Sequence, residues 1–271
     1  MHLTFPIRSD KLTMSVLVKE HVAHRKTEFQ TIDVYDTDVF GKVLFLDGHV
    51  QLSELDEHAY HESLVQIPLM SIDSPKRALV VGGGDGGVIR ELAKNRSLEH
   101  IDMVEIDAGV VEVCREHLPG VGGGAFDDPR VHLHIADAFP FVKKIAEPYD
   151  LIVMDSTDTY EEEDGALSEQ LFTEVFYQDC RNALTPNGFL VTQGDNLVFC
   201  PYSLEAILKT FGQVFERTGS YQALIPSFGG YSGFAWASKG PELSPIWRET
   251  GLSNRYLNPV TFALAFQRLR F

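Results

Sequence analysis

The residues with the clearest chemistry lie in a glycine-rich turn that also holds an acidic side chain. An apolar run, residues 79–81, leads into this turn, and Gly82, Gly84 and Gly87 have the G-x-G-x-x-G spacing of nucleotide-binding strand–turn–helix units. Such a turn normally offers backbone N–H groups to a pyrophosphate. Asp85 stands inside the turn, and its carboxylate would repel that anion. The turn therefore indicates a ligand that is neutral or cationic at this point.

More carboxylates follow the apolar runs further along the chain. They are Glu105 and Asp107, Asp137, and Asp155 with Asp158. Ligands of open α/β sheets bind outside the carboxyl ends of the strands, so acids at these ends should converge on one crevice. A crevice lined with carboxylates favours a cation.

Asp155 and Asp158 suit the chemistry of a primary amine. Two carboxylates so close together repel each other without a cationic partner, although both could simply form a turn. One acid would hold an ammonium group while the other takes a proton from the attacking nitrogen, because a free ammonium with a pKa of about 10 is not a nucleophile. The charge of the neighbouring acid should raise the pKa of the carboxylate that acts as the base.

The other acids indicate an adenosine-type ligand. Glu105 ends the apolar run that follows the glycine turn, where an acid commonly binds ribose hydroxyls. A surface acid, or the ribose acid of a nicotinamide-dependent oxidoreductase, would look the same. Asp137 could meet an adenine amino group, and it could equally cap a helix, since both roles are compatible.

The histidines do not indicate a metal site. His58 and His61 flank Tyr60 without a hydrolytic metal-binding order, and His132 and His134 share one face of a strand and are expected to meet solvent. The ribose acid, the acids at the strand ends and the lack of a phosphate-binding pattern together favour a sulfonium donor such as an adenosylmethionine derivative.

Composition restricts the class of partner. The chain has 271 residues with a formal net charge of −16, which disfavours nucleic acid and anionic membranes and is compatible with cationic small molecules. No apolar run reaches the roughly 18 residues of a membrane span, and the N-terminus lacks the pattern of a signal peptide. The three cysteines, Cys114, Cys180 and Cys200, form no disulfide framework. These features predict a cytoplasmic location.

The elements that must position these residues fall into three parts. Residues 1–55 read as an antiparallel β-domain, with an Asp-Gly turn at Asp47, and its exposed edges predict a homodimer or homotetramer. A helix is expected over 54–70. Residues 56–240 read as a Rossmann-like catalytic domain. Residues 241–271 read as an extended tail packed on that domain.

The expected fold is α/β, a mostly parallel sheet with helices on both faces. Strands are expected at 78–82, 101–106, 131–136, 150–154, 188–193, 218–225 and 233–238. Helices are expected at 86–95, 108–117, 138–146, 171–184 and 201–214.

A series of ordered motifs carries a family resemblance over almost the whole chain. The matching stretches are 46–51, 56–62, 81–91, 104–107, 127–130, 155–158, 171–177, 225–230, 234–237 and 255–259. On these stretches the chain resembles the polyamine aminopropyltransferases, in particular the bacterial spermidine synthases. The resemblance implies a fold of the class I methyltransferase type and transfer of an aminopropyl group from decarboxylated S-adenosylmethionine to an amine. That donor is a co-substrate, and no cofactor or metal is implied.

The resemblance also implies roles for individual residues. Asp155 would accept the proton and Tyr60 would orient the attacking nitrogen. On the donor side, the nucleoside and its side chain would be held by Gln30, Asp85, Glu105, Asp137 and Ala138. On the acceptor side, the amine would be bound by His61, Asp155, Ser156, Thr157, Asp158 and Gln193.

One stretch departs from the family pattern. After Asp158 the family usually continues with two prolines, whereas residues 159–168 are longer, acidic and free of proline. The acidic run, residues 161–164, could be a solvated loop tip, or it could attract a longer amine such as agmatine or spermidine. A protein that binds polyamines or nucleosides without catalysis is a further alternative.

Overall fold

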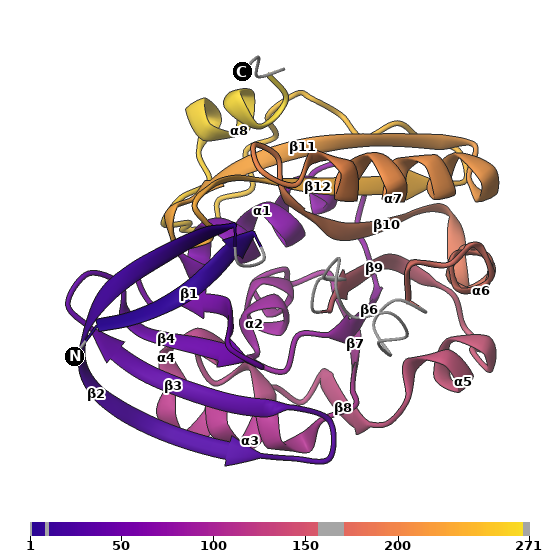
Figure 1. Ribbon diagram of the computed structural model, residues 1–271. Coiled ribbons are helices and arrows are strands. Elements are labelled where there is room, and N and C mark those ends of the chain that lie inside the picture. The colour runs from indigo at the N-terminus through magenta and orange to yellow at the C-terminus, as the bar shows by residue number, and fades with distance from the viewer. Residues whose placement is uncertain (1, 9–10, 157–170, 268–271) are drawn as a thin grey trace.

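A computed structural model describes residues 2–8, 11–156 and 171–267, and it contains two β-sheets (Figure 1). The first sheet is antiparallel, in the order β1-β2-β3-β4-β5. Its strands are β1 (His2–Arg8), β2 (Leu12–Lys26), β3 (Thr31–Thr37), β4 (Gly41–Leu46) and β5 (His49–Ser53). The predicted Asp-Gly turn is present between β4 and β5, where both Asp47 and Gly48 have positive φ.

The two faces of this N-terminal sheet have different partners. Ile32 and Val34 on one face pack against Val110 and Val113 of helix α3 (Ala108–His117). The opposite face gathers an apolar cluster of its own around Phe5, Phe40 and Phe45. The alternation along β3 thus buries one face against the rest of the molecule.

The second sheet has the order β11-β12-β10-β9-β6-β7-β8. Its strands are β6 (Arg77–Gly82), β7 (His100–Glu105), β8 (Val131–Ile135), β9 (Tyr149–Asp155), β10 (Leu184–Asn196), β11 (Arg217–Ile225) and β12 (Gly230–Ser238). Strands β8, β7, β6, β9 and β10 pair in parallel, and β12 is antiparallel to its neighbours β10 and β11. The chain runs outward from β6 to β8 and then returns to the other side of β6 with β9. The topological switch point, where open α/β sheets bind ligands, therefore lies between β6 and β9.

Helices cover both faces of this sheet (Figure 1), which confirms the expected fold class. The helices are α1 (Glu57–Leu69), α2 (Gly87–Ala93), α3 (Ala108–His117), α4 (Pro119–Gly122), α5 (Ala138–Lys143), α6 (Glu174–Ala183), α7 (Pro201–Val214) and α8 (Pro259–Ala265). Helices α1, α2 and α8 contribute to one core, while α5, α6 and α7 contribute to the other. None of the described helices is both long and apolar enough to cross a membrane.

Several elements differ from the sequence prediction. Strand β10 extends well beyond the expected 188–193 at both ends, and α5 ends at Lys143 although the helix was expected to reach residue 146. The helix expected over 171–184 begins only at Glu174, because Thr173 caps it by accepting a hydrogen bond from the Phe176 N–H at 3.3 Å. The tail after residue 240 is extended for most of its length but ends in α8, which was not predicted. Asn258 and Thr261 form a capping box at the start of α8, with a proline at its first position.

A buried carboxylate fastens the tail to α1. Glu62 is 1 % exposed and accepts hydrogen bonds from the backbone N–H groups of Arg255, Tyr256 and Leu257 at 2.7, 2.9 and 2.8 Å. A buried backbone N–H group without an acceptor lowers the stability of the fold. This one side chain therefore stabilises the position of the tail against α1.

We expect Glu62→Gln to lower the free energy of unfolding by about 1–3 kcal/mol, because an amide offers one acceptor oxygen where the carboxylate offers two. Urea denaturation at fixed protein concentration would measure the loss. Glu205→Gln, at an exposed position of α7, is the matched control and should leave the midpoint in place. Equal midpoints for both variants would contradict the role of Glu62.

Candidate active site

The start of α1 is fixed between the two sheets. The Asp56 carboxylate accepts hydrogen bonds from the Ser53 hydroxyl at 2.7 Å, from the Ser227 hydroxyl at 2.8 Å and from the Ser227 N–H at 2.7 Å. Ser53 ends the N-terminal sheet, and Ser227 lies between β11 and β12. The first turns of α1, which carry Tyr60 and His61, therefore have a defined position relative to the carboxyl ends of the parallel strands.

His61 is the centre of a buried chain of alternating charges. Its Nδ1 lies 2.7 Å from Glu57 Oε2, and its Nε2 lies 3.3 Å from Asp85 Oδ1. Arg90 donates hydrogen bonds to both oxygens of Glu57 at 2.9 Å. The order of charges is thus Arg90, Glu57, His61 and Asp85, running from α2 through α1 to the glycine turn.

This chain sets the ionisation of its members. Burial alone would lower the pKa of His61, but the charges and hydrogen bonds of Asp85 and Glu57 outweigh it and raise that pKa to about 10. Burial alone would raise the pKa of Glu57, but its bonds to His61 and Arg90 lower that pKa to about 2. At neutral pH His61 is therefore a cation, and both of its ring nitrogens face protein carboxylates.

The glycine turn lies directly against the end of β9. Gly82 pairs with Asp155 in the parallel register, and the Gly83 N–H donates a hydrogen bond to the Asp155 carbonyl oxygen at 2.9 Å. Gly82 has a φ of +83°, and a Cβ atom at this position would overlap the Asp155 carbonyl. Only glycine allows the turn that carries Asp85 to approach Asp155 this closely.

Asp155 has the properties of a general base. Its Oδ1 accepts a hydrogen bond from the Tyr60 hydroxyl at 2.7 Å, while its Oδ2 is buried without a hydrogen-bond partner among the described residues. Burial and the charge of Asp85 raise the pKa of Asp155 to about 6, against the opposing effects of His61 and Tyr60. A carboxylate with one oxygen fixed, one oxygen unpartnered and a pKa near neutrality is suited to take a proton from an amine.

A second group of polar residues lies at the end of β7. Gln30 Nε2 and the Thr27 hydroxyl donate to Asp107 Oδ2 at 2.9 and 2.8 Å, and the Asp107 N–H donates to Glu105 Oε1 at 2.8 Å. Burial raises the pKa of Glu105 to about 7, although the backbone N–H of Asp107 acts against it. The connection from β2 to β3 thus reaches the second sheet, and Asp107 links Gln30 to Glu105.

Comparison with known proteins identifies the family. Residues 57–244 match the family model described as the spermine/spermidine synthase domain, and residues 5–54 match the spermidine synthase tetramerisation domain. The chain belongs to the spermine/spermidine synthase family. Because the match of residues 57–244 spans more than half of the chain, the protein is an enzyme of the spermidine synthase type.

Curated relatives and solved structures agree with this assignment. The polyamine aminopropyltransferase of Pectobacterium carotovorum is 40 % identical over 87 % of this chain and 84 % of its own. That of Escherichia coli O157:H7 is 39 % identical over 90 % of this chain and 86 % of its own.

Two solved structures share the fold closely. A spermidine synthase in complex with the transition state analogue AdoDATO has a TM-score of 0.91 and 28 % identity, covering 99 % of this chain and 92 % of that one. The spermidine synthase of Thermotoga maritima has a TM-score of 0.89 and 27 % identity, covering 99 % and 91 %.

The remaining predicted site residues are less closely grouped. Asp137 caps α5, accepting a hydrogen bond from the Phe139 N–H at 2.9 Å, and the buried Ala138 follows it. Ser156 continues from Asp155, and its hydroxyl is buried without a partner among the described residues. Gln193 lies opposite Phe234 on β12, whose ring packs at 5.5 Å from that of Tyr60.

Some of the expectations stay predictions. Thr157, Asp158 and the acidic run 161–164 lie outside the described residues. Direct binding of an amine by His61 is also still a prediction, because the described contacts of its ring are with Glu57 and Asp85. What the contacts support is a role for His61 in positioning Asp85.

Both histidines on β8 meet solvent, as predicted: His132 is exposed, and the His134 side chain is 38 % exposed. The structure adds one contact, since His134 Nε2 lies 2.7 Å from Asp102 Oδ1. No sequence pattern indicated this bond, because Asp102 lies on a neighbouring strand.

Sequence reasoning missed three residues that orient the site. Glu57 binds the His61 ring and is itself bound by Arg90. Asp107 accepts a hydrogen bond from Gln30 and so links it to the end of β7. The spacing of Glu57 and His61, four residues apart on a helix, was a usable signal because such residues share one helix face. Arg90 had no comparable signal, since it meets Glu57 only through the packing of α2 against α1.

We expect Gly87→Ala to reduce kcat/KM for aminopropyl transfer by about 10²-fold, because displacing reacting groups by about 1 Å has that effect. A Cβ atom on Gly87 would overlap the His61 imidazole, which two carboxylates hold in place. Gly120→Ala is the control, since nothing lies within 4 Å of a Cβ there. Equal kinetics for the two variants would show that the position of His61 does not matter.

We expect kcat/KM to fall as the pH drops through about 6, because Asp155 must be ionised to accept a proton. Tyr60→Phe should move this acidic limb to higher pH, since the Tyr60 hydrogen bond lowers the pKa of Asp155. Glu105, whose pKa is raised to about 7, is present in both proteins. A difference between their pH profiles therefore reports the ionisation of Asp155. A limb that stays in place or moves to lower pH in Tyr60→Phe would contradict the assignment.

Proposed function

We propose that the protein transfers the aminopropyl group of decarboxylated S-adenosylmethionine to putrescine, giving spermidine and methylthioadenosine. The observation that carries the proposal is the buried Oδ2 of Asp155 beside Tyr60, which has no hydrogen-bond partner among the described residues. The family supports the reaction class, and the AdoDATO complex of a similar spermidine synthase supports a small-molecule site.

In the proposed reaction, the Asp155 carboxylate takes a proton from the ammonium group of the acceptor. The nitrogen lone pair then attacks the donor carbon next to the sulfonium, and the C–S bond breaks with its electron pair moving to sulfur. Sulfur becomes a neutral thioether while the new C–N bond forms and the product leaves as a secondary ammonium ion. Positive charge passes from sulfur to nitrogen inside a negative, largely water-free site, so orientation and electrostatics carry the acceleration.

Asp85 explains the choice of donor. Held by His61 and by the Gly87 N–H at 2.7 Å, its carboxylate would bind the donor's amino group. S-adenosylmethionine itself carries an additional carboxylate at this end, which Asp85 would repel. The same charge disfavours the pyrophosphate of a nicotinamide cofactor, so we set the oxidoreductase alternative aside.

The other roles follow the family resemblance. Gln30 and Glu105 would bind the ribose and the methionine-derived part of the donor, and Asp137 with Ala138 would meet the adenine. On the acceptor side, the amine would be bound by Ser156, Thr157, Asp158 and Gln193, while His61 would position Asp85. No cofactor is required in this scheme.

We further propose that the protein is a homotetramer that acts in the cytoplasm. The match of residues 5–54 to a tetramerisation domain supports the assembly. The free thiols of Cys114, Cys180 and Cys200 support a reducing location.

A mass-spectrometric assay with decarboxylated S-adenosylmethionine and four amines tests the acceptor. We expect methylthioadenosine with putrescine as the dominant acceptor over cadaverine, agmatine and spermidine. Dominance of agmatine or spermidine would keep the reaction class, reject putrescine and point to the acidic residues 161–164. The absence of methylthioadenosine with every amine would overturn the proposed reaction.

Asp155→Asn should lower kcat by about 10²- to 10⁴-fold, the usual contribution of a positioned general base. The affinity for the donor, measured by calorimetry, should change little because the donor-binding residues remain. Asp73→Asn, at an exposed site, is the control. Retention of most activity in Asp155→Asn would remove Asp155 from its assigned role.

A further inference from the structure

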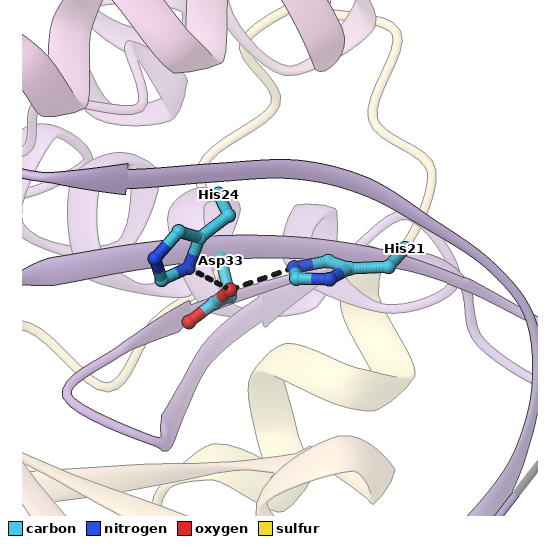
Figure 2. Close-up of side chains that lie close together, drawn as sticks. All are labelled: His21, His24 and Asp33. Carbon is cyan, nitrogen blue, oxygen red and sulfur yellow. Dashed lines mark hydrogen bonds and ion pairs between the residues drawn. The ribbon is translucent and has the colours of Figure 1, made fainter.

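Two histidines and an aspartate converge on the N-terminal sheet, away from the active site. His21 and His24 extend from β2, and Asp33 extends from β3 (Figure 2). His21 Nε2 lies 2.7 Å from Asp33 Oδ1, and His24 Nδ1 lies 2.8 Å from the same oxygen. Both imidazole rings are thus within hydrogen-bond distance of the same carboxylate oxygen.

A β-bulge brings the two histidines to the same face. Residues three apart on a regular strand point to opposite faces. In the register of β2 with β3, His21 pairs with Tyr35 and Ala23 pairs with Val34, so β2 holds one extra residue at this point. The bulge restores His24 to the face of His21 and sets it directly opposite Asp33.

Stacking on Tyr35 fixes the orientation of the His21 ring. The Tyr35 ring stacks on it, with centroids 4.2 Å apart and an angle of 13° between the planes. Asp33 itself is only 15 % exposed, whereas the side chains of His21 and His24 are 40 % and 59 % exposed. The cluster therefore has a fixed carboxylate, one stacked imidazole and one imidazole that can adjust.

We propose that His21, His24 and Asp33 bind a divalent transition-metal ion, with zinc the best fit. Two imidazole nitrogens and a carboxylate oxygen are ligands that zinc accepts, and a water molecule would complete a tetrahedron. The three donor atoms lie within 4.8 Å of one another. Magnesium and calcium prefer sites made of oxygen alone, so they fit this donor set poorly.

The change of geometry on binding is small. Ligands about 2.1 Å from a tetrahedral ion are about 3.4 Å apart, so each N···O separation must open by about 0.6 Å. The exposed His24 ring can supply such a movement by rotation. Each imidazole would then present a lone pair to the metal in place of the N–H that it directs at Asp33.

The site would link strands rather than take part in the transfer reaction. Asp33 and Tyr35 pair with Phe45 and Val43 of β4, which places the cluster on the face opposite Ile32 and Val34. The face that carries Ile32 and Val34 is the one that packs on α3. A bound ion would join β2 to β3 within residues 5–54, the part that matches the tetramerisation domain.

Zinc binding to the full chain, measured by calorimetry after treatment with a chelator, tests the proposal. His21→Gln and His24→Asn each keep an N–H that can donate to Asp33 but remove the imidazole. We expect each of them to bind one zinc equivalent per chain fewer than the unmodified protein. His132→Gln, which removes an exposed imidazole from β8, should bind as many as the unmodified protein.

Cobalt(II) gives a second readout that does not depend on stoichiometry. The unmodified protein should show the visible absorption of tetrahedral Co²⁺, and His24→Asn should lose it. Zinc should also raise the melting temperature of the unmodified protein and of His132→Gln, but not that of His24→Asn, because only a ligand bound to the folded state stabilises it. Equal zinc stoichiometry and equal cobalt spectra in all variants would overturn the proposal.

Discussion

The candidate active site depends on a buried row of alternating charges that runs from Arg90 through Glu57 and His61 to Asp85. A single charge in this position would be strongly destabilising, but each of these groups has an opposite charge beside it. The row fixes Asp85 in the middle of a glycine turn, where an isolated carboxylate would be unfavourable. It also supplies the negative charge that raises the pKa of Asp155.

The topology of the sheet places the row of charges beside Asp155, the proposed base. Strands β6 and β9 are neighbours at the switch point, so the turn after β6 and the acid at the end of β9 meet without any long loop. Helix α1 closes the site from one side, and its start is fixed by the bonds of Asp56 to both sheets. The residues proposed for the chemistry therefore lie on or beside regular elements, and the connection between β2 and β3 brings Gln30 to the end of β7.

Much of this arrangement was predictable from sequence because its signals are local. Apolar runs ending in Glu105 and Asp155 predicted acids at the carboxyl ends of parallel strands, and the glycine turn predicted the site of ligand approach. The features that escaped prediction depend on non-local pairing. The ion pair of Arg90 with Glu57 requires the packing of two helices, and the bulge that groups His21 with His24 appears only once β2 is paired with β3.

Burial and the charge of Asp85 bring the pKa of Asp155 near neutrality, as a general base requires. Isotope-edited infrared difference spectroscopy can follow the Asp155 carboxyl through a pH titration, with Asp155→Asn as the blank. We expect a pKa of about 6 for this group in the protein without substrates. A pKa near the ordinary aspartate value of about 4 would contradict it.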